Sequence, residues 1–370
     1  MGQFGVGQPV RRKEDVRLLK GNGQYLDDLK IENELYAVIV RSPHAHAKIN
    51  SIDISIAENT LGVVAVYTAK NLTEDNIGGI PCLAKVKSKD GKDMANPIRP
   101  LLANKFVRYV GDYVAIVLGE SHKIAKDATE LVDVDYEVLP STIDTANANN
   151  ENSPLVWNEY PRNRVFDWEN GDEKKTDDAF AQAKNICEIE MINNRIVCNS
   201  MEPRGAIASY DTETKSYTLH TPCQHVHLMR DLVSQALKID KDKLRVISPD
   251  VGGGFGMKVF VYPEQALVTY AAKKLSRPIK WVSDRSEAFL SDNQGRDHVI
   301  KAAIATDENG KILGIKVNCI SNMGAYLSNF APMIATLAGT IMMTGLYDIP
   351  TAYVNVIGVF TNTIPIDAYR

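Results

Sequence analysis

A run of eleven residues at 249–259, PDVGGGFGMKV, has the composition of a ligand-binding loop. Four of the five positions 252–256 are glycine, and each ordered glycine costs about 0.5–1 kcal/mol relative to alanine. The run lies between a predicted strand and a predicted helix, a junction at which backbone N–H groups can face an anionic or oxo ligand. Phe255 would hold the loop while the glycines admit a ligand to the backbone. We therefore expect a ligand site here, with a plain turn as the alternative.

Neither common nucleotide-binding motif fits this loop. A G-x-G-x-x-G fingerprint that starts at Gly252 needs glycine at position 257, where the chain has Met257. A phosphate loop, G-x-x-x-x-G-K-[ST], needs Ser or Thr after Lys258, where the chain has Val259. The spacing therefore indicates neither a dinucleotide nor a nucleoside triphosphate.

Histidines and cysteines give no local metal site. His44 and His46 are two residues apart, as are His225 and His227, and such a pair shares a face on a strand but not on a helix. No third ligand is suggested near either pair. The five cysteines form no C-x-x-C motif, and no G-x-S-x-G nucleophile motif is present. We expect no metal ligand from the side chains of this chain and no hydrolase.

The elements that must position the glycine loop follow from the apolar periodicity. In the first part of the chain the expected elements are strands at residues 35–40, 61–67, 113–118 and 132–136 and a helix at 123–131. A polar, asparagine-rich stretch at 145–153 indicates a domain boundary. We expect an α/β (α+β) chain of two domains, residues 1–145 and residues 154–370.

The second domain is expected to place the loop between a strand and a helix. Its predicted elements are hairpins at 206–221 and 300–317, helices at 225–237 and 264–275, and strands at 244–247 and 279–282. The second hairpin turns at Asn309-Gly310. Residues 317–347 carry no charge but contain many polar side chains and glycines, so we expect a buried segment rather than a membrane span.

Composition excludes some partners. Lys and Arg number 42 against 46 Asp and Glu, a formal charge of -4 without a long block of one sign, which argues against nucleic acid or an anionic membrane as the main partner. The start MGQFGV has no signal-peptide pattern, and five sparse cysteines fit a reducing compartment. We expect a cytoplasmic location.

Several blocks of sequence, in order, resemble the molybdenum hydroxylases, the family that includes xanthine dehydrogenase and aldehyde oxidoreductase. In the second domain these blocks are MEPRGAIASYD at 201–211, TPCQHVHLMRDLVSQAL at 221–237, VGGGFGMK at 251–258, RPIKWVSDRSE at 277–287, GRDH at 295–298, YDIP at 347–350 and TNTIPIDAYR at 361–370. In the first domain GNGQYLDDL, VRSPHAHAKINSID, RYVGDYVAIVLGES and VDVDYEVLP resemble the α/β hammerhead domain that opens the molybdopterin subunit. The chain is most similar to the bacterial nicotinate dehydrogenases with a split molybdopterin subunit.

The resemblance implies a cofactor and its contacts. The cofactor is molybdenum with molybdopterin cytosine dinucleotide, with a sulfido or selenido ligand on the metal. Gly253, Gly254 and Gly256 would let the backbone approach it, with Phe255 over the metal. In the same family pattern Gln224 would donate a hydrogen bond to an oxo ligand and Arg370 would lie near the metal's ligands; the alternative for Gln224 is a cap on its own helix.

The resemblance also implies partners and a reaction, the insertion of water-derived oxygen at an electron-poor carbon. The family's glutamate base lies in the later half of the subunit, so either the sequence is truncated or a second molybdopterin subunit supplies the base, beside [2Fe-2S] and FAD subunits. Val259 stands where xanthine-oxidising members have glutamate, and residues 335–343 lack their arginine. We expect an N-heteroaromatic acid such as nicotinate as substrate. Aldehyde or carbon monoxide oxidation is the alternative, and a non-catalytic scaffold is a third possibility.

Overall fold

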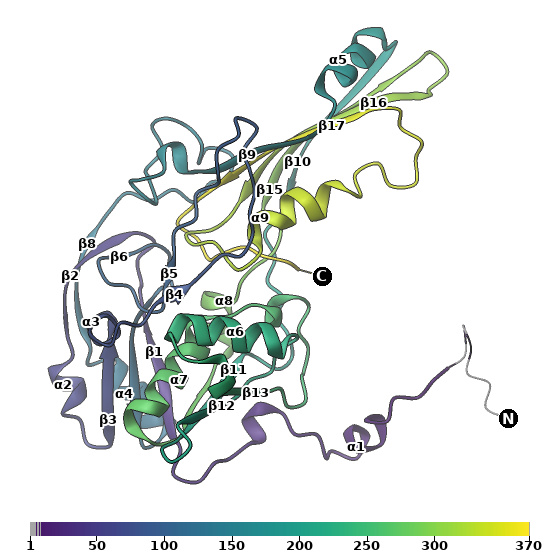
Figure 1. Cartoon of the computed structure of the whole chain (residues 1–370). Helices are drawn as coiled ribbons and strands as arrows, with labels where there is room; N and C mark the ends of the chain where they lie inside the picture. Colours follow the sequence, from purple (N-terminus) through teal and green to yellow (C-terminus); the bar gives the residue numbers. More distant parts are fainter. Residues whose placement is uncertain (1–4, 6, 8, 370) are drawn as a thin grey trace.

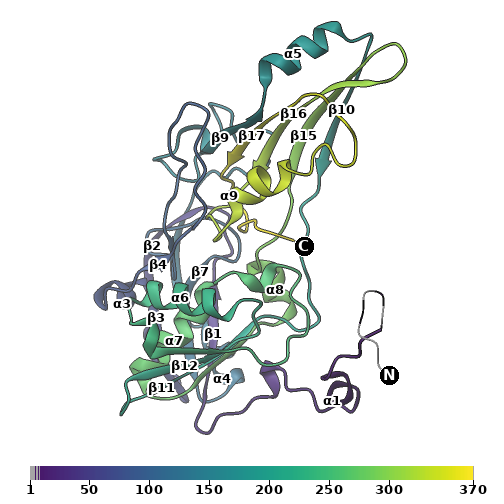
Figure 2. The same cartoon turned by 45° about the vertical axis from the view of Figure 1, so that its right-hand side comes forward.

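The computed structural model describes residues 5, 7 and 9–369. Figure 1 shows a large mixed sheet with helices at one end of the molecule and a long antiparallel-rich sheet at the other. The second view, in Figure 2, keeps the same two bodies, with the chain of residues 323–333 and α9 (Ala331–Met333) between them. The α/β fold class predicted from the sequence is confirmed.

The large sheet has seven strands, four from the second part of the sequence side by side and then three from the first part. From edge to edge the strands are β13 (Leu244–Ile247), β12 (Ser216–His220), β11 (Gly205–Asp211), β14 (Ile279–Val282), β1 (Leu35–Arg41), β7 (Tyr113–Gly119) and β3 (Val63–Thr68). β1 pairs with β14 in parallel, with Leu35 opposite Ile279. The sheet is therefore continuous across the expected domain boundary at 145–153.

Helices cover both faces of this sheet. In β1, Ala37 and Ile39 face the main core beneath α6 (Val226–Leu237) and α7 (Pro263–Leu275), whereas Val38 faces α4 (His122–Thr129). Successive side chains of a strand point to opposite faces, so one apolar strand serves two cores. Every residue of β7 is buried, which explains its uninterrupted apolar sequence.

The second sheet has five strands and carries a helix on one face. Its strands in order are β10 (Asn185–Asn193), β15 (His298–Thr306), β16 (Ile312–Asn322), β17 (Ala352–Val359) and β9 (Arg164–Gly171). α5 (Glu173–Gln182) packs on β16 and β17. β10 is an edge strand whose residues are exposed except for its last.

Smaller elements complete the chain. A three-stranded sheet contains β6 (Phe106–Val107), β2 (Ala47–Asp53) and β8 (Asp133–Val138); β4 (Gly79–Ile80) pairs with β5 (Arg99–Pro100); the short helices are α1 (Asp15–Leu19), α2 (Ser55–Glu58), α3 (Ala69–Glu74) and α8 (Arg285–Ser291). Among the described residues no helix has the length and apolar character needed to cross a membrane.

Most predicted elements are present within one or two residues of the expected bounds. There are two exceptions: the strand expected at 312–317 continues to Asn322, and the uncharged segment 317–347, which we expected to be buried, is buried only in part. The first part of this segment, which contains the end of β16 and continues to Thr336, is mostly buried. Residues 337–347 are largely exposed. Leu346 and Ile341 are wholly or mostly open to solvent. The prediction was wrong for this second part because absence of charge does not distinguish a core segment from an apolar surface.

A buried network of charges joins the two halves of the chain. The carboxylate of Glu264, at the start of α7, lies 2.9 Å from Arg41 and 3.0 Å from Arg204, and Arg204 also pairs with Asp292 at 2.6 Å. Burial alone would raise the pKa of Glu264, but the charges of Arg204 and Arg41 lower it to about 2. The carboxylate is therefore ionised in the fold.

Replacing Glu264 with Gln should destabilise the chain by about 3–5 kcal/mol, because two buried guanidinium groups lose their shared partner. Since the folded pKa lies below the ordinary 4.5, this stabilisation is present above that pH and is lost as the pH falls towards 2. Urea unfolding of the variant and the parent, repeated at falling pH, measures both effects. Glu190→Gln, in the exposed pair with Lys301 on β10, is the control and should leave stability nearly unchanged. Equal effects of the two substitutions would contradict the account.

Candidate functional site

The glycine loop joins β13 to α7 and owes its shape to glycines at two positions. Gly253 and Gly256 have φ of +101° and +91°, values that other residues rarely adopt. Phe255 between them has φ of +51°, an uncommon conformation for a large side chain and one that is concentrated at functional sites. The loop is thus an ordered, strained element and not a plain turn.

The other two glycines allow close approach. A Cβ atom at Gly254 would lie 2.5 Å from the Oε1 atom of Gln224, and one at Gly252 would lie 2.5 Å from the Cβ atom of Glu202. Neither contact can be accommodated without movement of the neighbour. Two of the four glycines are therefore needed for their positive φ angles, and the other two because a side chain would overlap a neighbouring residue.

Gln224 is bound to this loop through both its backbone and its side chain. Its backbone N–H donates to the carbonyl of Lys258, and its Oε1 atom accepts from the N–H of Gly256, both at 3.0 Å. An N–H group must donate to oxygen, so this contact orients the amide with its NH2 group turned away from Gly256. The side chain is exposed. Its amide is therefore a preset hydrogen-bond donor at the surface of the loop.

The alternative role of Gln224 as a helix cap is wrong. The cap of α6 is His225, whose Nδ1 atom accepts from the N–H of Leu228 at 3.2 Å. This contact also gives His225 a structural role. The side chain of Gln224 is left to contact the loop.

Phe255 lies partly over the loop and partly open to solvent. A Cβ atom at Gly253 would be 3.0 Å from the ring of Phe255, so the ring covers that glycine. The residue remains 41% exposed. A large aromatic surface left open beside an amide donor is a suitable wall for a bound group.

Beneath the loop the end of the described chain completes the site. Met257, Phe260, Tyr262 and Cys198 form a small apolar cluster, on which Ala368 and Tyr369 pack. Asp367 accepts hydrogen bonds from the N–H groups of Phe330 and Ala368, and burial raises its pKa to about 6. The block TNTIPIDAYR is thus brought to the loop as far as Tyr369. Arg370, predicted near the metal's ligands, lies outside the described residues.

The histidine pairs do not form sites. His46 has its Nδ1 atom 3.0 Å from the carbonyl of Pro140, and burial lowers its pKa. His44 packs edge-on against Tyr136. His227 lies within α6. Over residues 9–369, together with 5 and 7, no group of three or more His, Cys, Asp or Glu side chains is placed to hold a metal ion.

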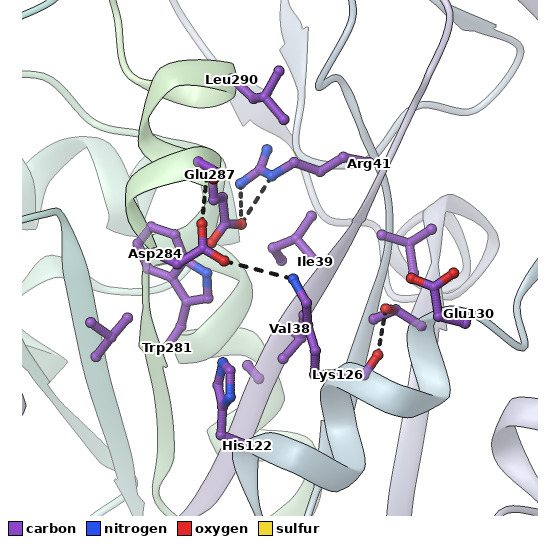
Figure 3. Close-up of a pocket in the computed structure, with 15 residues that line it drawn as sticks. Val38, Ile39, Arg41, His122, Lys126, Glu130, Trp281, Asp284, Glu287 and Leu290 are labelled. Carbon is purple, nitrogen blue, oxygen red and sulfur yellow. Dashed lines mark hydrogen bonds and ion pairs between the residues drawn. The ribbon is translucent and has the colours of Figure 1, made fainter.

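A separate cavity of about 320 Å³ lies between α4, β1 and α8. Figure 3 shows its paired charges, with Lys126 facing Asp284 at 3.7 Å and Arg41 facing Glu287 at 2.6 Å. No residue of the glycine loop lines it. The cavity is therefore distinct from the candidate site.

Comparison with known proteins gives the family of the chain. Residues 156–370 match the model of the molybdopterin cofactor-binding domain, and residues 20–140 match the aldehyde oxidase and xanthine dehydrogenase a/b hammerhead domain. The chain belongs to the molybdopterin-binding subunits of the xanthine dehydrogenase and aldehyde oxidase family.

Three relatives illustrate the likeness. The carbon monoxide dehydrogenase large chain of Afipia carboxidovorans is 34% identical over 97% of this chain and 44% of its own length. The quinoline 2-oxidoreductase structure from Pseudomonas putida 86 superposes with a TM-score of 0.92 at 33% identity, over 99% of this chain and 46% of that chain. The nicotinate dehydrogenase large molybdopterin subunit of Eubacterium barkeri is 28% identical over 99% of this chain and 81% of its own length. The chain thus spans less than half of the first two relatives.

A double-substitution test checks the close approach at Gly254. Gly254→Ala should destabilise the chain by about 1–3 kcal/mol, because the new methyl group overlaps the Gln224 amide. With Gln224→Ala in addition, the added cost should be much smaller, because the overlapping atoms are gone. Free energies of unfolding in urea give the coupling. Gly314→Ala, whose methyl group would contact Thr351 and Ala179 and not Gln224, is the control and should be additive with Gln224→Ala. Strict additivity at Gly254 would contradict the contact.

Proposed function

We propose that this chain is the molybdopterin-binding subunit of a molybdenum hydroxylase that inserts water-derived oxygen at an electron-poor carbon. The observation that carries the proposal is the Gly256–Gln224 hydrogen bond, which turns an amide donor outward beside the exposed ring of Phe255. Family membership supports it. Because the chain spans less than half of most of its relatives, its activity is proposed for a complex and not for the chain alone.

The residues present fit the cofactor. A Cβ atom at Gly254 would lie 2.5 Å from the Gln224 amide oxygen, so glycine at this position keeps the amide donor against the loop backbone. Gln224 would hold an oxo ligand through its NH2 group, and Phe255 would exclude water from one side of the metal. When bound, molybdenum with molybdopterin cytosine dinucleotide, carrying a sulfido or selenido ligand, supplies the two-electron oxidation and the activated oxygen. Arg370 is proposed as a further contact.

The substrate proposed is an N-heteroaromatic acid such as nicotinate. Val259, half-buried behind Lys258, offers no carboxylate to a purine, and residues 335–343 offer no arginine. The names of the quinoline and nicotinate relatives fit this class. Carbon monoxide or aldehyde oxidation is the second candidate, favoured by the 34% identity to a carbon monoxide dehydrogenase.

Partner subunits are part of the proposal. We propose a second molybdopterin subunit that supplies the glutamate base, together with [2Fe-2S] and FAD subunits, in the cytoplasm. The nicotinate dehydrogenase large molybdopterin subunit of Eubacterium barkeri is covered over 81% of its own length. The open apolar side chains of residues 337–347 and of β10 support the proposal of partner subunits, since exposed apolar side chains that lie close together are typical of an interface.

The direct test is elemental analysis of the native complex purified through this chain. Molybdenum in proportion to the chain is expected, with FAD and [2Fe-2S] in the partners. A complex without molybdenum would end the proposal. Turnover of nicotinate, purines, aldehydes and carbon monoxide by the same preparation separates the substrate classes.

Substitutions in the complex test the roles of the loop residues. Gln224→Ala removes a donor of the kind whose loss typically costs about 100- to 1,000-fold in turnover, so kcat should fall by that order while molybdenum content is largely kept. Phe255→Ala should lower kcat to a smaller extent by admitting water. Glu137→Gln, in the exposed pair with Lys48 on another sheet, is the control and should leave both quantities unchanged. Full turnover and full cofactor content in both loop variants would favour a non-catalytic scaffold.

A further inference from the structure

Glu202, in the segment that precedes β11, touches both ends of the glycine loop. Its Oε2 atom accepts from the N–H of Gly252 at 2.8 Å and from the Nζ atom of Lys258 at 2.9 Å. The backbone of Glu202 makes two further hydrogen bonds to the loop. Its N–H donates to the carbonyl of Gly252, and its carbonyl accepts from the Nζ atom of Lys258 at 2.8 Å. Glu202 therefore links the first glycine of the loop, Gly252, to its lysine, Lys258.

Lys258 depends on this partner. Its side chain is fully buried, and both hydrogen bonds of its ammonium group that lie within the described chain go to Glu202. Burial lowers the pKa of Lys258, and the Glu202 carboxylate opposes that shift. A buried ammonium is costly unless it is paired, so the ion pair holds the end of the loop in a single position.

The chain that precedes β1 is tied to the same place. The N–H of Leu26 donates to the Oε1 atom of Glu202 at 3.3 Å. At the start of the loop Asp250 pairs with Arg17 and accepts from the N–H of Gln24, each at 2.7 Å. Figure 1 shows this arm, with α1, running past the end of the large sheet that carries β12 and β13. Two carboxylates thus fasten the arm and the loop to each other.

We propose that Glu202 is a positioning residue that sets the conformation of the glycine loop. Within the described residues its hydrogen bonds to the loop go to Gly252 and Lys258, so it acts through the loop and not through Gln224. Four glycines give a chain many alternative conformations, and links at both ends reduce that freedom to the one in which Gly256 faces Gln224. The consequence for cofactor binding rests on the proposed function; the effect on the loop does not.

Hydrogen exchange of the full chain, followed by mass spectrometry, tests this role without any cofactor. In Glu202→Ala the loop amides at residues 252–259 should exchange roughly 10- to 100-fold faster, because hydrogen bonds to a charged group are lost. The peptide of β7 should be unchanged. Glu202→Gln, whose amide oxygen can still accept from Gly252, should show a smaller increase.

The matched control is Asp211→Ala, which removes another carboxylate that accepts from backbone N–H groups, those of Glu213 and Thr214. It should speed exchange in its own turn and leave the loop unchanged. If Glu202→Ala does not fold, Glu202→Gln with Lys258→Met leaves no unpaired buried charge and should still show faster exchange in the loop. Unchanged loop exchange, or an equal increase in β7, would overturn the proposal.

Cofactor content separates this inference from the proposed function. In a complex that contains molybdenum, Glu202→Gln should reduce molybdenum occupancy, while Asp211→Ala should not. Absence of molybdenum from the parent complex would refute the proposed function and leave the exchange result standing. Normal molybdenum occupancy in a Glu202→Ala complex, together with unchanged exchange, would refute the positioning role alone.

Discussion

At Gly254 the backbone passes so close to Gln224 that a Cβ atom would lie 2.5 Å from the amide oxygen. Because residue 254 has no side chain, the Gln224 amide can lie against the loop, where its oxygen accepts from the N–H of Gly256. The NH2 group of the amide is therefore turned outward. The exposed ring of Phe255 then lies beside a donor of fixed direction. The chemistry proposed for the chain depends on this contact between segments that are 32 residues apart in sequence.

The contact is possible because the two ends of the loop are held by a larger frame. β13 belongs to a sheet that takes strands from both halves of the chain, and α7 packs on that sheet. Glu264 at the start of α7 is bound to Arg41 at the end of β1. Buried charge pairs of this kind tolerate little displacement, because a separated charge in the core is costly. The hammerhead segment therefore supports the loop mechanically, although it contributes none of the loop's residues.

Sequence patterns predicted all seven strands of the large sheet and missed β9, β10 and β17 of the second sheet. β13 and β14 have the predicted bounds, because short apolar runs between turns are strong signals. β10 was missed since its apolar side chains lie on both faces and all are exposed. The four glycines predicted a ligand loop, and the family resemblance supplied Gln224 and Phe255. The part played by Glu202 could not be predicted, because its partners Leu26 and Lys258 are distant in sequence and no spacing rule connects them.

The central claim is that the backbone of the glycine loop makes room for a molybdenum cofactor. The most direct test is the molybdenum content per chain of the complex with Gly254→Val, measured beside the parent and a folded Gly314→Ala control. The account predicts molybdenum in the parent and the control and almost none in the Gly254→Val complex, with the same subunits assembled. An equal molybdenum content in all three would contradict it.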